Sequence, residues 1–502
     1  MSSDRKKIFQ DSTQYAIVTV FGQSVSLIRA ILIPILLSPI QLGVWNLMNV
    51  VVGYGGNAHL GVLHGMNKII PLLRGQGALA EVEEIKDSTF WVNMFLGAGW
   101  FVFIWVCSYA VRSGYSNALR ITAFTILMLS IYGYYFSLLR ADNRFKLVSV
   151  GVGGLSILST IFVLGLSWFC KDRLVGALLG LVAAYGLVVI FWVLKSRYHF
   201  IFHISSDAVR RSFGMGVPLI ILGVFDSIFL SVDRWVIAAS MGATMLGYYA
   251  LGIMSSNLIG LVPSSIASVL YPKMLERFGA NGNPTALKSL FVGPTRLMAG
   301  FVSLLIGGAM IILPFLIKFI LPKFLPSVSL FIILLPAAFF YAAASIPGSF
   351  MVSINKQRLL IVIQIVAISF ALMLDFVVVK MRWGIVGIAC STAFAYAVYG
   401  GGYIITAAHF AFKRRADIVH FLVEIYGVFA AMLLGLILTM SFIPEGADMG
   451  IAVVFTAVRL VCFLAVLLPV IWWSNRQTGL LAIAREMFPA YFNRSKGDQG
   501  ND

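Results

Sequence analysis

The chain has 502 residues, of which 60% are hydrophobic and only 11% are charged, and its formal net charge is +17. An ordinary soluble domain carries roughly 25% charged residues, so the composition excludes a soluble globular protein. Apolar stretches of roughly 20 residues without alternating polarity predict spanning helices and exclude an outer-membrane barrel. We therefore expect an all-α polytopic membrane protein.

Apolar stretches of spanning length recur along the whole chain, and we count about fourteen. They cover residues 15–37, 43–66, 89–111, 118–138, 148–169, 174–194, 213–239, 245–270, 290–320, 329–352, 359–379, 384–408, 420–442 and 449–473. The glycines of GYGGNAHLG (53–61) and GALLG (176–180) are expected inside such helices, where they permit close packing or bending.

Positive charge is distributed unevenly over the connections between these spans. One set of connections carries most of the Lys and Arg, and the opposite set holds only Arg112, Lys171, Arg173, Lys323, Lys380 and Arg382. The positive-inside rule then places both termini in the cytoplasm and the chain in the cytoplasmic (inner) membrane. Because the basic excess is a topology signal, it does not indicate a nucleic-acid partner.

The connections also bear on catalysis. The outer ones are too short for an extracytoplasmic catalytic domain, and no cytoplasmic loop contains the G-x-x-x-x-G-K-[ST] phosphate-binding motif. The four cysteines lie singly in apolar stretches, without the spacing of a metal site or a redox pair. We expect no catalytic residues, no metal and no cofactor, and hence no enzyme.

An internal repeat relates two parts of the chain. The stretch IRAILIPILLSPIQLGVWNLMN (28–49) aligns with DRWVIAASMGATMLGYYALGI (233–253), which places Arg29 on Arg234 and, after one residue of slack, Gly43 on Gly247. The offset of about 200 residues corresponds to six helices, an even number, so the repeat is parallel. We expect two six-helix lobes at 1–194 and 213–408, a linker at 195–212 that is amphipathic enough for an interfacial helix, helices 13 and 14 at 409–473, and a cytoplasmic tail at 474–502.

A helix that carries an arginine, the turn SPIQLGVWNLMN and a second helix that ends in MNKIIPLLRGQG together resemble a known family. They look like the Wzx-type oligosaccharide flippases of the polysaccharide transport family, within the multidrug/oligosaccharidyl-lipid/polysaccharide exporter superfamily. The likeness is strongest over residues 10–90 and 210–280, and the helix count extends it over the chain.

The resemblance implies a flippase that moves an undecaprenyl-pyrophosphate-linked oligosaccharide to the outer leaflet by alternating access, for O-antigen, capsule or exopolysaccharide biosynthesis. Its partners would be that lipid-linked substrate, membrane lipids and, as an open question, other polysaccharide assembly proteins. Alternatives within the superfamily are a lipid II flippase and a multidrug exporter. A polysaccharide polymerase or ligase is the alternative from a different class.

Charged side chains inside the predicted spans cost about 2.5–3.5 kcal/mol each at mid-bilayer, so they face a partner or a wet cavity. A guanidinium keeps its proton and presents a planar fork that suits phosphate oxygens. We predict that Arg29 and Arg234, one from each lobe, face each other across a cavity and bind the anionic head group. Arg459 and Arg296 are further candidates.

Other polar groups in the spans suggest supporting roles. Asp226 and Asp233 lie two helical turns apart and would serve as charge partners or in ion coupling; an ion pair that only fixes packing is the alternative. The candidate sugar contacts are Asn57, His59, His64 and Asn257. Such groups also form plain hydrogen bonds between helices, so that alternative stays open.

Overall fold

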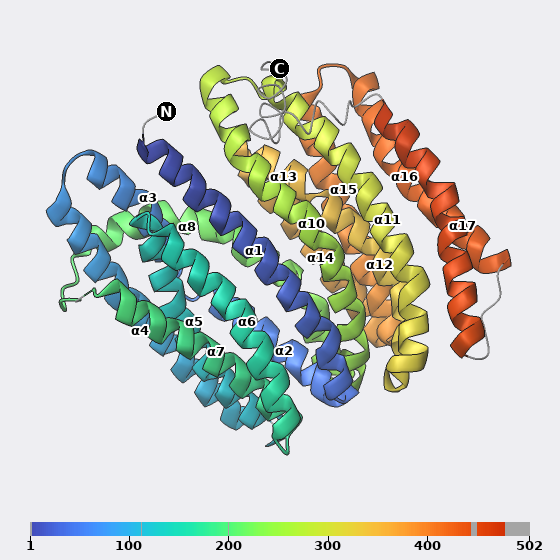
Figure 1. Ribbon diagram of the computed structural model, residues 1–502, viewed down its shortest axis with the longest axis horizontal. Coiled ribbons are helices and arrows are strands. Elements are labelled where there is room, and N and C mark those ends of the chain that lie inside the picture. Colours follow the sequence, from blue (N-terminus) through green and yellow to red (C-terminus); the bar gives the residue numbers. More distant parts are fainter. Residues whose placement is uncertain (1–2, 112, 199, 443–448, 477–502) are drawn as a thin grey trace, which may run out of the picture. The chain divides into compact units, whose positions relative to one another are not determined.

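The computed structural model describes residues 3–111, 113–198, 200–442 and 449–476, and within these ranges every regular element is a helix (Figure 1). The α-helices are α1 (Ser3–Leu36), α2 (Pro39–Gly55), α3 (Val62–Gly75), α4 (Leu79–Ala110), α5 (Ser113–Ala141), α6 (Phe145–Phe169), α7 (Arg173–Ser196), α8 (Ser206–Phe229), α9 (Val232–Ser240), α10 (Ala243–Asn281), α11 (Lys288–Ile320), α12 (Val328–Ala343), α13 (Ser345–Ser353), α14 (Gln357–Met381), α15 (Gly384–Ala411), α16 (Arg415–Phe442) and α17 (Met449–Arg476). Two 3-10 helices, η1 (Pro284–Leu287) and η2 (Pro322–Ser327), precede α11 and α12.

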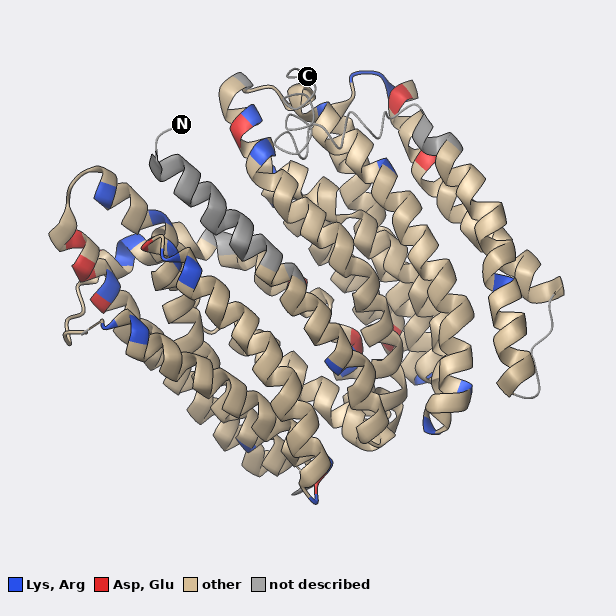
Figure 2. Ribbon diagram, viewed as in Figure 1, with Lys and Arg blue, Asp and Glu red and all other residues tan. Residues whose placement is uncertain are grey.

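The prediction of an all-helical polytopic membrane protein is confirmed. Among the described residues, 11 helices are long and apolar enough to cross a membrane, or 12 when the two parts of the bent α8 count as one span. The remaining predicted spans fall on α1, whose apolar part is Phe21–Leu36, and on the α2–α3 pair. Figure 2 shows Lys, Arg, Asp and Glu concentrated near the helix ends, with few along the middles of the helices.

The chain forms two compact units, Met1–Ala250 and Leu251–Asp502. We call them the first and the second unit. The boundary lies inside α10, so α8 and α9 belong to the first unit. The predicted linker between the lobes at 195–212 does not coincide with this boundary and stays a prediction. Residues 477–502 of the predicted tail lie outside the described residues.

In the first unit, glycines let helices approach closely. A Cβ atom built on Gly176 would lie 2.6 Å from the carbonyl carbon of Leu166, so α7 packs directly on the backbone of α6. A Cβ atom on Gly151 would lie 2.5 Å from the indole nitrogen of Trp192, which donates a hydrogen bond to Leu147 O at 3.0 Å. The close packing expected for the GALLG stretch is therefore present.

In the second unit, α12 packs on α15 and α10. A Cβ atom on Gly400 would lie 2.6 Å from the carbonyl carbon of Phe340, which shows how near the two backbones come. The Ser256 hydroxyl on α10 donates to Leu334 O on α12 at 3.1 Å. The core of this unit therefore forms around tightly packed small and aromatic residues.

The segment between α7 and α8, where an interfacial helix was expected, is not helical over most of its length. Residues 197–198 and 200–205 are not helical, and α8 begins only at Ser206. Instead the segment lies along α4: Trp91 Nε1 donates to Ile201 O at 3.0 Å, and the Ser205 amide donates to the Ser88 hydroxyl at 3.0 Å. These bonds satisfy backbone groups that a helix would have paired internally.

Candidate functional site

The second predicted span is broken in its middle. Helix α2 ends at Gly55 and α3 starts at Val62, so GYGGNAHLG does not lie inside a continuous helix as expected. The break depends on Leu60 and Gly61, whose φ angles of 47° and 96° are in the left-handed region that a helix cannot accommodate. Irregular backbone at this depth is tolerated only where it is buried in protein or lines a cavity.

The break is packed against a second irregular helix. A Cβ atom on Gly61 would lie 2.6 Å from the carbonyl carbon of Gly216, and one on Gly65 would lie 2.6 Å from that of Ser212. Helix α8 itself bends by 50° between its parts Ser206–Val217 and Ile220–Phe229. Two interrupted spans therefore lie side by side in the first unit.

Three of the four candidate sugar contacts gather at this break. Asn57 Nδ2 donates to the Ser227 hydroxyl on α8 at 3.2 Å, and His59 Nδ1 accepts from the Gly61 amide at 3.0 Å. The rings of His59 and His64 lie 5.0 Å apart, edge to face. The fourth candidate, Asn257, is an exposed residue of α10 in the second unit.

Arg29 is half-buried on α1 and points toward α6. Its Nη1 atom donates to the Ser159 hydroxyl at 2.6 Å, and that hydroxyl in turn donates to Ser156 O at 3.2 Å. The hydrogen bond joins residues 130 positions apart in the sequence. A neutral hydroxyl orients the guanidinium and leaves its charge uncompensated at this contact.

Arg234 lies near the start of α9, next to a buried carboxylate. The Asp233 side chain is buried; it accepts from the Arg234 amide at 2.7 Å and from the Tyr249 hydroxyl at 2.5 Å. Arg234 is half-buried, and its Nε atom has no hydrogen-bond partner among the described residues. Since α8 ends at Phe229, Asp226 and Asp233 lie on different helices, so their two-turn spacing does not place them on one continuous face.

The other two candidate arginines belong to the second unit. Arg296 on α11 forms an ion pair with Glu424 on α16, whose side chain is 10% exposed, and His420 Nδ1 lies 3.4 Å from the same carboxylate. Sequence reasoning missed Glu424, although an acidic residue inside the predicted span 420–442 was a sufficient signal. Arg459 is a half-buried residue of α17.

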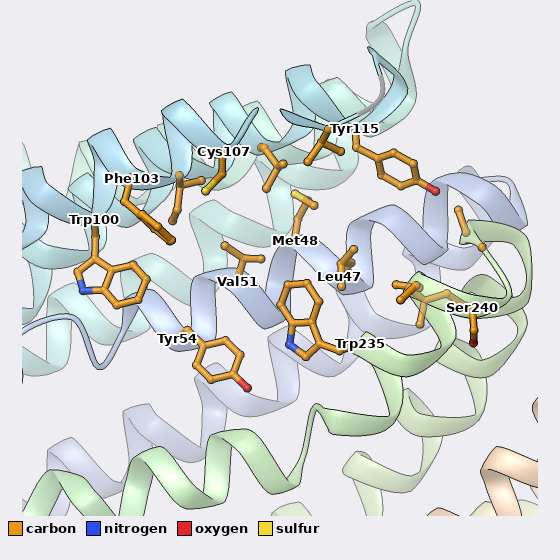
Figure 3. Close-up of a pocket in the computed structure, with 18 residues that line it drawn as sticks. Leu47, Met48, Val51, Tyr54, Trp100, Phe103, Cys107, Tyr115, Trp235 and Ser240 are labelled. Atoms are coloured by element: carbon orange, nitrogen blue, oxygen red, sulfur yellow. The ribbon is translucent and has the colours of Figure 1, made fainter. Parts of the chain in front are cut away.

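The first unit also contains an apolar cavity of about 780 Å³ that sequence reasoning did not find (Figure 3). It lies between α2, α4, α5, α9 and the start of α10, and most of its lining is apolar. Its largest lining side chains are Tyr54, Trp100, Phe103, Tyr115 and Trp235. A cavity of this size falls within the range of small-molecule sites.

Comparison with known proteins bears on both family and fold. Residues 78–278 match the family described as polysaccharide biosynthesis protein. The lipid II flippase MurJ in an inward closed conformation aligns over 89% of this chain and 97% of its own, with 14% identity and a TM-score of 0.64. An inward-facing multidrug resistance MATE family transporter of the MOP superfamily aligns over 81% and 98%, with 14% identity and a TM-score of 0.60. The chain shares its fold with these two proteins.

A Vibrio cholerae MATE transporter in its bent form has the same fold, with a TM-score of 0.53, 14% identity, and coverage of 84% of this chain and 98% of its own. No curated protein matches the sequence. The resemblance predicted from the sequence is thus confirmed, by the family match over 78–278 and by the fold shared with the MurJ flippase and a MATE family transporter.

Within this fold, residues that the repeat alignment makes equivalent touch each other. A Cβ atom on Gly43 of α2 would lie 2.8 Å from the Gly247 amide nitrogen and 3.0 Å from the carbonyl carbon of Ala243. A Cβ atom on Gly247 would lie 2.6 Å from the carbonyl carbon of Pro39. The N-terminal turns of α2 and α10 therefore cross with their backbones in direct contact.

Proposed function

We propose that the protein is a flippase that moves an undecaprenyl-pyrophosphate-linked oligosaccharide from the cytoplasmic to the outer leaflet. It would serve the biosynthesis of a surface polysaccharide such as O-antigen, capsule or exopolysaccharide. The observation that carries this proposal is the match of residues 78–278 to the polysaccharide biosynthesis family, in a chain with the MOP-superfamily fold. The uneven distribution of Lys and Arg supports a cytoplasmic-membrane location with both termini inside.

The physical problem for such a substrate is its head group. The polyprenyl tail can remain in the bilayer, but pyrophosphate and sugars cannot cross hydrocarbon without a polar path. Alternating access offers that path without a catalytic step. With the cell interior negative, each negative charge that moves outward gains about 2.3 kcal/mol per 100 mV, so the potential can drive export without ATP.

We assign the head-group site to Arg29 and Arg234. Both are half-buried arginines of the first unit. The hydrogen bond that Arg29 donates to Ser159 orients one guanidinium, and the buried Nε atom of Arg234 has no hydrogen-bond partner among the described residues. Arg459 remains a further candidate. The Glu424 carboxylate already offsets the charge of Arg296. Arg296 could therefore bind an anion only if this ion pair opened.

The polar residues near the break of α2 and α3 are proposed to contact the sugars. Asn57, His59 and His64 supply both donors and acceptors at a point where the backbone is irregular. Asn257 is a more distant candidate in sequence, and Asp226 or Asp233 would carry any coupled ion. Other polysaccharide assembly proteins are proposed partners on the family match alone.

Transport by the purified protein in liposomes tests the proposal. The substrate is a fluorescent lipid-linked oligosaccharide, and its arrival in the opposite leaflet is read by a membrane-impermeant quencher. Arg29→Ala and Arg234→Ala should each abolish transport, while the lysine variants retain part of it because they keep the charge but lose the fork. Arg210→Ala, at an exposed position of α8, is the control and should transport normally.

Other outcomes of the same assay separate the alternatives. Equal transport of lipid II would move the proposal to a lipid II flippase, and transport of a cationic drug in its place would identify a multidrug exporter. Glycan chain joining by the purified protein would instead indicate a polymerase or ligase. Full activity of both alanine variants would reject the arginine site.

A further inference from the structure

The apolar cavity of the first unit has a size and a lining that suit a long hydrocarbon chain. An apolar cavity of about 150 Å³ stays dry and holds one benzene molecule, so 780 Å³ has room for roughly 30 carbon atoms. Five aromatic rings face this space from several helices, and they offer flat apolar surfaces. An apolar lining of this size gains dispersion contacts when hydrocarbon fills the space.

The cavity lies toward the outer ends of its helices. Among its lining residues, Val111 follows the end of α4, Ser240 ends α9, and Gly242 precedes α10. All three adjoin connections that the charge distribution places on the outer side. In Figure 3, Tyr115 and Ser240 lie at one end of the cavity, and Trp100, Phe103 and Tyr54 lie at the other. The cavity therefore belongs to the outer half of the membrane.

Arg234 lies on α9 beside residues that line this cavity, although it is not itself a lining residue. It directly precedes Trp235 and lies one helical turn before Ala238, and both of these residues line the space. The Ser231 hydroxyl, which precedes α9, is hydrogen-bonded at 2.8 Å to the hydroxyl of the lining residue Tyr54. The buried Nε atom of Arg234 lacks a hydrogen-bond partner in the described part of the chain. A buried guanidinium nitrogen without a hydrogen-bond partner thus lies on a helix that lines an apolar space.

We propose that this cavity holds the polyprenyl chain of the carrier lipid after translocation, with the lipid phosphate at Arg234. The inference rests on the proposed function, which it deepens by giving the tail its own site. A polyprenyl chain fits better than a phospholipid acyl chain because its planar trisubstituted double bonds stack on aromatic rings, whereas saturated chains gain no such contact. Each isoprene unit contributes five carbons, so the cavity takes roughly six units of the chain.

The test uses a sugar-free polyprenyl monophosphate that carries a photoreactive group on its chain, with the full-length protein in lipid nanodiscs. Mass spectrometry should locate the cross-links on Trp100, Phe103 or Trp235. Ala238→Phe fills the cavity and should lower cross-linking about tenfold, whereas Ala430→Phe, at an exposed position of α16, should leave it unchanged. If Ala238→Phe does not fold, Trp235→Leu removes a half-exposed ring and should also weaken the labelling.

Two further probes separate the parts of the proposal. Arg234→Gln should reduce labelling by the monophosphate but not by the corresponding polyprenol, which has no charge to bind. A photoreactive phosphatidic acid should label the cavity at least tenfold less than the polyprenyl monophosphate does. Equal labelling by both lipids, or cross-links that stay unchanged in Ala238→Phe and Trp235→Leu, would overturn the tail site.

The same set of assays distinguishes this failure from failure of the proposed function. If the parent protein transports the oligosaccharide lipid while the cavity takes no polyprenyl probe, the transport proposal stands and the tail site falls. If the cavity takes the polyprenyl probe and no oligosaccharide lipid is moved, the tail site stands and the transport proposal falls.

Discussion

Replacing Gly43 by alanine should loosen the crossing between α2 and the start of α10. The added Cβ atom would lie 2.8 Å from the Gly247 nitrogen, which is 0.6 Å inside the 3.4 Å at which ordinary contact begins. Its nearest neighbours are backbone atoms of Ala243 and Gly247, so no side-chain rotation can relieve the overlap and the two helices must separate. Overpacking of this kind costs about 1–3 kcal/mol.

The matched control is Gly53→Ala on the same helix. A Cβ atom there would meet nothing within 4 Å, and alanine in a helix is favoured over glycine by roughly 0.5–1 kcal/mol. Thermal unfolding in detergent, followed by tryptophan fluorescence, should therefore give a lower apparent midpoint for Gly43→Ala and an unchanged or higher midpoint for Gly53→Ala. Equal midpoints for the two variants would refute the steric reasoning.

Two further predictions concern other contacts. Gly216→Ala should destabilise by about 1–3 kcal/mol because its Cβ atom would lie 2.6 Å from the carbonyl carbon of Gly61, while Gly214→Ala, with nothing within 4 Å, should not; the unfolding midpoints of the two variants decide. Arg296→Gln and Glu424→Gln should each destabilise by about 3–5 kcal/mol, because a buried charge loses its partner. The double variant should lose less than the sum of the two, and strict additivity in the same measurement would show that the pair is not coupled.

The spans could be predicted because hydropathy reports directly on burial in lipid, but the breaks could not. Pro34, Pro71, Pro263 and Pro272 all lie inside helices of the structure, whereas the interruption at 56–61 contains no proline. That interruption depends on left-handed backbone and on close contact with α8, which is distant in sequence. Proline positions therefore do not mark this interruption, which lies inside the glycine-rich stretch 53–61.

The charged residues could be found in the sequence, but their partners could not. Arg29 bonds to a serine 130 positions away, and Arg296 is paired with a glutamate that the expected set of intramembrane acids left out. The apolar cavity could not be predicted from the sequence, because its lining residues come from several helices and do not differ in type from other residues of an apolar span. Tertiary packing alone separates a lining residue from a lipid-facing one.

The repeat alignment has a geometric consequence at the crossing of α2 and α10. It makes Gly43 equivalent to Gly247, and the same offset makes Pro39 equivalent to Ala243. The contacts obey that equivalence: the Cβ position of Gly43 meets Ala243, and that of Gly247 meets Pro39. A local two-fold axis interchanges equivalent residues, so a contact between Gly43 and Ala243 implies a matching contact between Gly247 and Pro39. The structure contains both contacts. A register shifted by one residue would break this exchange, so the packing independently supports the alignment of Gly43 with Gly247.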